Sequence, residues 1–176
     1  MTRIYSFNPI EHLDAEILIL GTMPGSASLA AGQYYAHTRN AFWRIISEIL
    51  KLDADSLYEV KVQALKSARI AVWDVLQSCT REGSLDAMIE HDTLIINDFY
   101  TFFQSHRQIT QVFFNGAKAE AYFRQYVLPK INLDNISFLR LPSTSPANAS
   151  MPFEAKLKAW QIILESNQFE NLISNK

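Results

Sequence analysis

The loop that spans residues 33–41 carries side chains that could hold a flat, polar ligand. It contains two phenol rings, two nitrogen-rich side chains and one amide: Tyr34, Tyr35, His37, Arg39 and Asn40. Rings can stack on a planar group, and an amide offers both hydrogen-bond donors and an acceptor. This combination is typical of a site for a nucleobase. Because an apolar helical pattern opens at Phe42, Asn40 could also serve only as a helix N-cap.

A short buried strand precedes this loop and would position it. Ile17 to Leu20 is an uninterrupted apolar run, and the glycine and proline residues that follow end it. Three of the chain's five glycines fall between this run and Tyr34. Glycine is common where the backbone bends sharply or approaches a ligand closely. Since sites in open parallel sheets form beyond the carboxyl ends of strands, we expect Gly21 to Ser26 to line one.

The rest of the chain alternates between strand and helix patterns. β-Branched and aromatic runs predict further strands over residues 70–75, 112–114 and 136–141. Apolar periodicity predicts helices over residues 41–50, 57–65, 117–126 and roughly 152–166. A capping box at Ser56 and Glu59 would start the second helix, and Asn97-Asp98 would cap a short extra one. Four strands that alternate with helices predict an α/β fold, with a parallel sheet covered on both faces.

Two more loops follow predicted strands at the same edge of the sheet. Asn115-Gly116 ends the third strand, and the segment Pro142 to Asn148 follows the fourth. Parallel strands end at one edge, so we expect Asn115 and residues 143–148 to share a cleft with the first loop. On sequence alone, Asn115-Gly116 could equally be an ordinary turn pair, and the serines of the last loop could be turn residues.

Composition bounds the class of protein. A length of 176 residues suits one domain, residues 1–176, and the net charge of −2 gives no strong global attraction to nucleic acid. Cys79 is the only cysteine, which excludes an intramolecular disulfide and argues against a zinc or iron–sulfur site. No apolar run is long enough to span a bilayer and no signal-peptide pattern opens the chain, so we expect a cytoplasmic protein.

Known nucleotide and catalytic motifs are absent. Residues 21–26 read Gly-Thr-Met-Pro-Gly-Ser, which is neither a dinucleotide-binding fingerprint nor a phosphate-binding P-loop. A nucleophile elbow is also missing. The four histidines show no metal-ligand spacing: His12, His37, His91 and His106. We therefore expect no metal and no cofactor.

Four motifs in order resemble those of the uracil-DNA glycosylase superfamily, and of its hypoxanthine (deoxyinosine) DNA glycosylase branch most of all. They run from the first strand to the last helix: Gly21-Thr-Met-Pro-Gly25, Tyr34-Tyr-Ala-His-Thr-Arg-Asn-Ala-Phe-Trp43, Phe114-Asn-Gly116 and Leu141-Pro-Ser-Thr-Ser-Pro-Ala-Asn148. The resemblance implies a three-layer α/β/α sandwich around a central four-stranded parallel sheet. That architecture agrees with the strand and helix pattern. Many members carry an Asp or Asn where this chain has Met23, which can neither activate nor position water.

The resemblance also implies roles for individual residues. The catalytic candidates are Asn40, which matches the key polar residue of the branch, together with Asn115 and Ser143. Tyr35 would stack on the base, and residues 146–148 would press into the gap that a flipped base leaves. The full binding set is Gly21, Thr22, Met23, Pro24, Gly25, Ser26, Tyr35, His37, Arg39, Ser145, Pro146, Ala147 and Asn148.

The implied function is excision of a deaminated base from DNA. A base flipped out of damaged DNA would lose its N-glycosidic bond to water, leaving an abasic site. The enzyme would be a DNA-deoxyinosine glycosylase of base excision repair. It would be monofunctional, because no lysine stands in these loops as a Schiff-base nucleophile. We also expect it to act on damaged DNA as a monomer. Hypoxanthine, uracil and xanthine stay open as substrates. A nucleoside or nucleotide hydrolase and a non-catalytic module that binds damaged DNA remain alternatives.

Overall fold

A four-stranded parallel sheet forms the centre of the molecule in the computed structural model, which describes residues 2–165. Its strand order is β3-β2-β6-β7, and every neighbouring pair is parallel. The strands are β2 (Ile17–Gly21), β3 (Ile70–Asp74), β6 (Gln111–Asn115) and β7 (Ser137–Leu141). Each of them overlaps one of the four predicted strands. The predicted parallel sheet is therefore confirmed.

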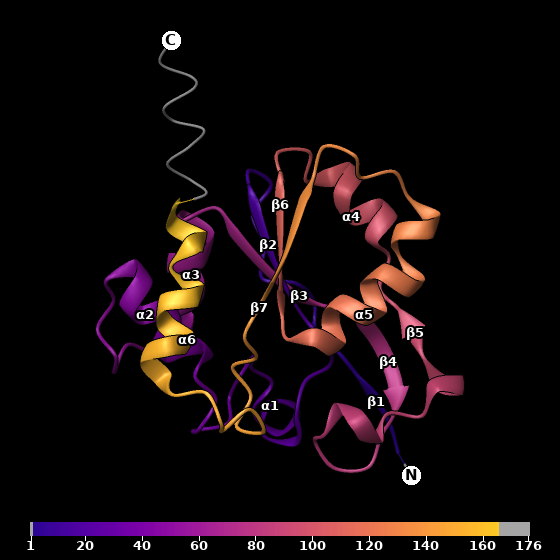
Figure 1. Ribbon diagram of the computed structural model, residues 1–176, viewed down its shortest axis with the longest axis horizontal. Coiled ribbons are helices and arrows are strands. Elements are labelled where there is room, and N and C mark those ends of the chain that lie inside the picture. Colours follow the sequence, from indigo (N-terminus) through magenta and orange to yellow (C-terminus); the bar gives the residue numbers. More distant parts are fainter. Residues whose placement is uncertain (1, 166–176) are drawn as a thin grey trace.

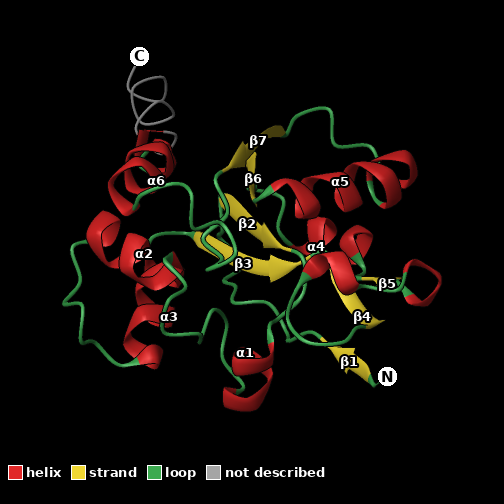
Figure 2. Ribbon diagram, turned by 60° about the horizontal axis from the view of Figure 1, so that its bottom comes forward, coloured by secondary structure: helices red, strands yellow, loops and turns green. Residues whose placement is uncertain are grey.

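Helices cover both faces of this sheet, as the sequence pattern predicts. Figures 1 and 2 show α2, α3 and α6 on one side of the strands and α4 and α5 on the other. The short α1 lies at the end of the sheet where the loop after β2 leaves it. The helices are α1 (Ser26–Ala31), α2 (Phe42–Leu50), α3 (Tyr58–Ser67), α4 (Phe99–Ser105), α5 (Ala117–Tyr126) and α6 (Phe153–Trp160). The predicted last helix ends at residue 166, which lies outside the described residues.

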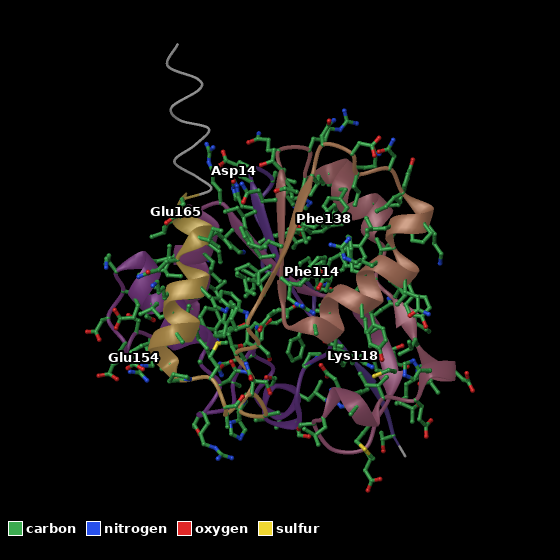
Figure 3. All side chains as sticks on the ribbon, viewed as in Figure 1. Asp14, Phe114, Lys118, Phe138, Glu154 and Glu165 are labelled. Atoms are coloured by element: carbon green, nitrogen blue, oxygen red, sulfur yellow. The ribbon has the colours of Figure 1, made fainter. Side chains whose placement is uncertain are left out.

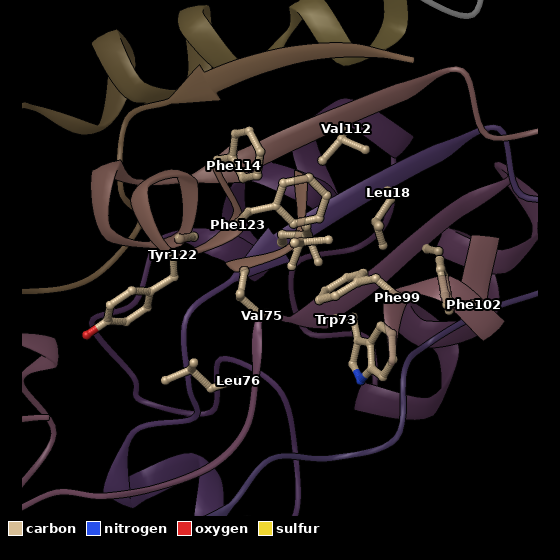
Figure 4. Close-up of a cluster of buried hydrophobic side chains, with 14 of the residues drawn as sticks. Leu18, Trp73, Val75, Leu76, Phe99, Phe102, Val112, Phe114, Tyr122 and Phe123 are labelled. Atoms are coloured by element: carbon tan, nitrogen blue, oxygen red, sulfur yellow. The ribbon is translucent and has the colours of Figure 1, made fainter. Parts of the chain in front are cut away.

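Alternate residues of the strands build two hydrophobic cores. On β2, Leu18 and Leu20 pack toward α4 and α5, whereas Ile17 and Ile19 pack toward α2 and α6. Figure 4 shows the first core, where Leu18 lies with side chains of β3, α4 and α5. At its β7 side, the labelled rings of Phe114 and Phe138 in Figure 3 stack 6.2 Å apart. Burial on both faces explains why the strands are apolar runs rather than alternating patterns.

A second, antiparallel sheet and one helix are not predicted by the sequence. The sheet has the order β1-β4-β5, from β1 (Arg3–Tyr5), β4 (Leu76–Thr80) and β5 (Ile95–Ile96). Two of these strands are too short to show any periodicity. The predicted loop after Ser26 is instead α1, and short 3-10 turns lie at Asp86–Met88, His91–Thr93 and Leu128–Lys130. Within residues 2–165, no helix is long and apolar enough to cross a membrane.

The two predicted helix caps have different outcomes. Asp98 is the N-cap of α4, where its carboxylate accepts a hydrogen bond from the Thr101 backbone N–H at 3.0 Å. The predicted capping box at Ser56 and Glu59 is wrong, because α3 begins at Tyr58 after Leu57 and no side chain caps it. An apolar residue at the cap position leaves these first N–H groups without a local side-chain acceptor.

Candidate functional site

A cavity of about 610 Å³ lies at the carboxyl edge of the parallel sheet. Its walls come from the loops after β2, β4 and β7 and from the last residues of β2, β3 and β6. All the predicted site residues line it except Arg39, whose side chain is exposed. The lining also includes residues that the sequence analysis did not select: Ala27, Ser28, Asp74, Ser84, Leu85, Asp86 and Ala87. Tyr34, from the loop with the aromatic rings, and Thr144, from the predicted segment 143–148, line it too.

Asn40 enters the cavity from the turn that starts α2. Its Oδ1 accepts a hydrogen bond from the Phe42 backbone N–H at 2.9 Å, so the side chain does bind the first turn of the helix. The residue that formally caps α2 is Ala41. The Nδ2 group of Asn40 has no acceptor among the described residues. The helix contact therefore uses the oxygen of the amide and leaves both N–H donors for a ligand.

Asn115, at the end of β6, is bound on both sides of its amide. Its Nδ2 donates to Thr144 Oγ1 and its Oδ1 accepts from the Thr144 backbone N–H, both at 2.9 Å. The Thr144 carbonyl in turn accepts from the Ala41 N–H at 3.0 Å. Asn115 thus fixes the loop after β7 and links it to the start of α2.

The two tyrosines of the first motif have different surroundings. Tyr34 is buried, and its hydroxyl donates at 2.9 Å to the carbonyl of Asn8, a residue that does not line the cavity. Tyr35 has a φ of 54°, a left-handed conformation that is costly for a bulky residue. One face of its ring stacks on Phe42, with the centroids 4.0 Å apart. Stacking on a bound base, predicted from the sequence, would require the opposite face and stays a prediction.

His37 organises the loop between Tyr35 and α2. Its Nδ1 accepts from the Arg39 backbone N–H at 3.1 Å, and its carbonyl accepts from the Asn40 N–H at 2.8 Å. Both contacts are local, as expected if His37 shapes the loop. They place the backbone of Asn40 relative to the cavity that His37 also lines.

A clamp from the segment after β4 holds the first loop. The Arg81 side chain is buried and donates to the carbonyls of Pro24 and Gly83. The Ser84 hydroxyl accepts from the Ser26 backbone N–H at 2.9 Å. The backbone donor of Ser26 is therefore already occupied within the protein.

Asp74 is the most strongly perturbed acidic group of the cavity. It ends β3 with only 3% of its surface exposed, and Ser6 Oγ donates to its Oδ2 at 3.0 Å. Burial raises the pKa of Asp74 to about 7, and the Ser6 hydrogen bond lowers it only in part. A carboxyl group inside an otherwise apolar strand, Ile70–Asp74, is the sequence signal that could have revealed it.

The loop after β7 is supported from behind by a lysine. Lys156 of α6 is 6% exposed, and its Nζ donates to the Asn148 carbonyl at 2.8 Å. Within the same loop, Asn148 Nδ2 donates to the Ser143 carbonyl and Ser143 Oγ accepts from the Ser145 N–H. Lys156 itself does not line the cavity.

Comparison with known proteins agrees with this geometry. Residues 9–164 match the family model described as the uracil DNA glycosylase superfamily. The chain belongs to the uracil DNA glycosylase superfamily. The resemblance of the four motifs is thereby confirmed, and the cavity lies where those motifs meet.

Relatives of this superfamily member carry a more specific name. A hypoxanthine DNA glycosylase from Methanosarcina barkeri is 38% identical over 117 residues, 66% of this chain and 73% of that protein. Another, from Methanosarcina acetivorans, is 36% identical over 136 residues, 77% of this chain and 82% of that protein. The solution NMR structure of a candidate uracil DNA glycosylase from Methanosarcina acetivorans has a TM-score of 0.72 and 30% identity. That match covers 92% of this chain and 99% of the other.

This member of the superfamily has no acid or amide side chain in residues 21–26, directly after β2. Residues 21–26 supply glycine, proline, hydroxyl and thioether groups, and Met23 packs into the core under α4 and α5. The acids of the cavity come from elsewhere, Asp74 at the end of β3 and Asp86 after β4. Burial raises the pKa of Asp86 as well, although Arg81 opposes this from 3.6 Å. The carboxyl groups of the cavity are thus supplied by the end of β3 and by the segment after β4.

Proposed function

We propose that this protein is a monofunctional DNA glycosylase that releases hypoxanthine from damaged DNA. The observation that carries the choice of base is that two curated relatives, 38% and 36% identical, are hypoxanthine DNA glycosylases. The cavity of about 610 Å³ is consistent with a flipped purine nucleotide, since ligand pockets fall in the range of about 300–1,000 Å³. Uracil and xanthine are the next bases to test.

The chemistry needs a group that stabilises the departing base. Cleavage of an N-glycosidic bond builds positive charge on the sugar and negative charge on the base. Asn40 supports this step because its Nδ2 donors are free while its Oδ1 is held by the Phe42 N–H. A donor fixed in this way needs little reorganisation when charge develops, which is the basis of electrostatic catalysis.

The loop after β7 is the part that we assign to the gap in the duplex. Pro146 and Ala147 are small, rigid side chains on the cavity wall, and Asn115 and Lys156 hold the loop from two sides. Lys156 Nζ is bound to the Asn148 carbonyl and lies outside the cavity lining. A lysine placed there has no access to the sugar, which supports simple hydrolysis without a Schiff base.

A base-release assay tests the proposed function. Duplex and single-stranded oligonucleotides would carry hypoxanthine, uracil or xanthine, with free deoxyinosine as a separate substrate. We expect release of hypoxanthine and strand breakage only after alkali, because a monofunctional enzyme leaves an intact abasic strand. Breakage without alkali would reject the monofunctional mechanism. Hydrolysis of free deoxyinosine alone would indicate a nucleoside hydrolase, and lesion binding without release would indicate a non-catalytic module.

A further inference from the structure

The two carboxylate oxygens of Asp74 are in different situations. Oδ2 accepts from the hydroxyl of Ser6, which is not part of the cavity lining. Oδ1 lies over Gly21, the residue paired with Asp74 across β2 and β3. A Cβ at Gly21 would come within 2.5 Å of Oδ1, so only glycine leaves room for this oxygen. Gly21 lines the cavity, so Oδ1 lies beside the cavity wall, whereas Oδ2 is bound to Ser6.

The groups around Asp74 make its neutral form well populated near pH 7 and dominant below it. Burial and, to a smaller extent, the carboxyl of Asp86 raise its pKa, and the net value is about 7. Arg81 and the Ser6 hydroxyl act in the opposite direction. Tyr35 faces the same carboxyl, and the pKa of its phenol is raised by burial and by Asp74, so the phenol stays protonated. In the neutral acid, Ser6 keeps Oδ2 as an acceptor, which leaves the proton on Oδ1.

A second polar atom lies beside Oδ1. The Tyr35 hydroxyl is buried and has no hydrogen bond of full geometry within residues 2–165, although the Asn115 side chain is close enough to lower the pKa of the phenol in part. It would lie 2.9 Å from the same Gly21 Cβ position that defines Oδ1. A polar ligand edge that enters the cavity would give this buried hydroxyl a further hydrogen-bond partner.

We propose that Asp74 reads the base, by donating a hydrogen bond from a protonated Oδ1 to the 6-oxo group of hypoxanthine. This proposal rests on the proposed function. Deamination of adenine replaces a 6-amino group, which is a donor, with an oxygen acceptor. The donor at Oδ1 therefore accepts hypoxanthine and rejects adenine, whereas it does not distinguish guanine, which also has a 6-oxo group. The contact also stabilises negative charge on the departing base.

Substitution of Asp74 and a pH series test this role through single-turnover rates at subsaturating enzyme. Asp74→Asn keeps an acceptor for Ser6 and an N–H donor for the base, so its rate should be independent of pH. The wild-type rate should fall about tenfold per pH unit above the pKa of the free enzyme, because the ionised group cannot donate. Asp74→Ala should lose about 100- to 1000-fold at low pH. Asp55→Asn, at an exposed loop position, is the matched control and should keep the wild-type profile.

The opposite role for Asp74 makes the opposite prediction. If its carboxylate activates water, the wild-type rate rises with pH and Asp74→Asn is as slow as Asp74→Ala. That result would overturn the proposal. Ser6→Ala offers an independent check, since it removes the group that fixes which oxygen carries the proton. We expect this variant to discriminate less between hypoxanthine and adenine, and unchanged discrimination would contradict the assignment.

A binding measurement keeps the test separate from catalysis. A 2′-fluorinated deoxyinosine resists cleavage because fluorine destabilises the oxocarbenium ion, so its duplex can be compared with the deoxyadenosine duplex. Wild type should prefer the inosine duplex at pH 6 and lose that preference at pH 9, and Asp74→Ala should lack it at both. If no lesion is cleaved but this pattern holds, the proposed function fails and base reading by Asp74 stands. Equal binding of both duplexes at both pH values would overturn the reading role.

Discussion

Two asparagines at the carboxyl edge of the sheet have the same chemistry and opposite situations. Asn115 uses both ends of its amide on Thr144, whereas Asn40 uses only its oxygen, on the Phe42 N–H. Both were catalytic candidates from the sequence. The difference suggests a division of labour in which Asn115 holds the architecture of the site and Asn40 acts on the substrate. Thr144 takes one of the two Asn115 N–H donors and fixes the plane of that amide, whereas both donors of Asn40 are left for a transition state.

Replacement of Asn40 has the largest expected effect. Asn40→Ala removes the free donors and should slow single-turnover release of hypoxanthine by about 100- to 1000-fold, or about 2.7–4 kcal/mol. Asn40→Asp should be similarly slow, because an ionised aspartate accepts from the Phe42 N–H but cannot donate. Melting temperatures measured in parallel report the loss of the helix contact, which is about 0.5–2 kcal/mol. If both variants release base at nearly the wild-type rate, Asn40 is only a cap.

Substitution of Asn115 should affect stability first. Asn115→Ala leaves the Thr144 N–H and hydroxyl without partners, at a cost of about 1–3 kcal/mol for each buried group. Asn115→Asp keeps the acceptor for the Thr144 N–H and accepts from its hydroxyl. It should therefore change the rate by less than about fivefold, equivalent to about 1 kcal/mol. Denaturant titration and single-turnover rates on the same samples give both numbers. A rate loss in Asn115→Asp as large as in Asn40→Asp would erase the distinction between the two asparagines.

The sequence predicts most of this edge because its motifs end strands. Buried strands such as β2 and β6 are apolar runs with abrupt ends, and parallel strands bring their ends together. The sequence analysis did not select Asp74 as a site residue, because the predicted strand ended at Val75 and Asp74 lay inside that apolar run. The sequence analysis also did not select Asp86. Its position in the cavity depends on a contact between distant parts of the chain, in which Arg81 binds the Pro24 carbonyl. The sequence also could not predict that the Nδ2 donors of Asn40 are free, because this depends on how the side chain is oriented, and residue spacing alone does not determine that orientation.

Gly116 follows Asn115 directly, and its substitution tests whether the architecture around Asn115 affects the chemistry at Asn40. We expect this substitution to have the smallest effect of those proposed here. Its φ of 95° suits glycine alone, and a Cβ there would lie 3.0 Å from the Ser143 Cβ, in the loop that Asn115 holds. Gly116→Ala should cost about 1–3 kcal/mol in stability and also displace Ser143, so folded enzyme should release base more slowly.

Gly32 is the matched control for this substitution. It also has a positive φ, 64°, at the C-cap of α1, but a Cβ there would meet no atom within 4 Å. Gly32→Ala should therefore cost about 1–2 kcal/mol of backbone strain without changing the rate of folded enzyme. Denaturant titration corrects each rate for the folded fraction. Equal rate losses in the two variants would mean that the loop after β7 tolerates displacement, and that the architecture assigned to Asn115 does not limit the chemistry at Asn40.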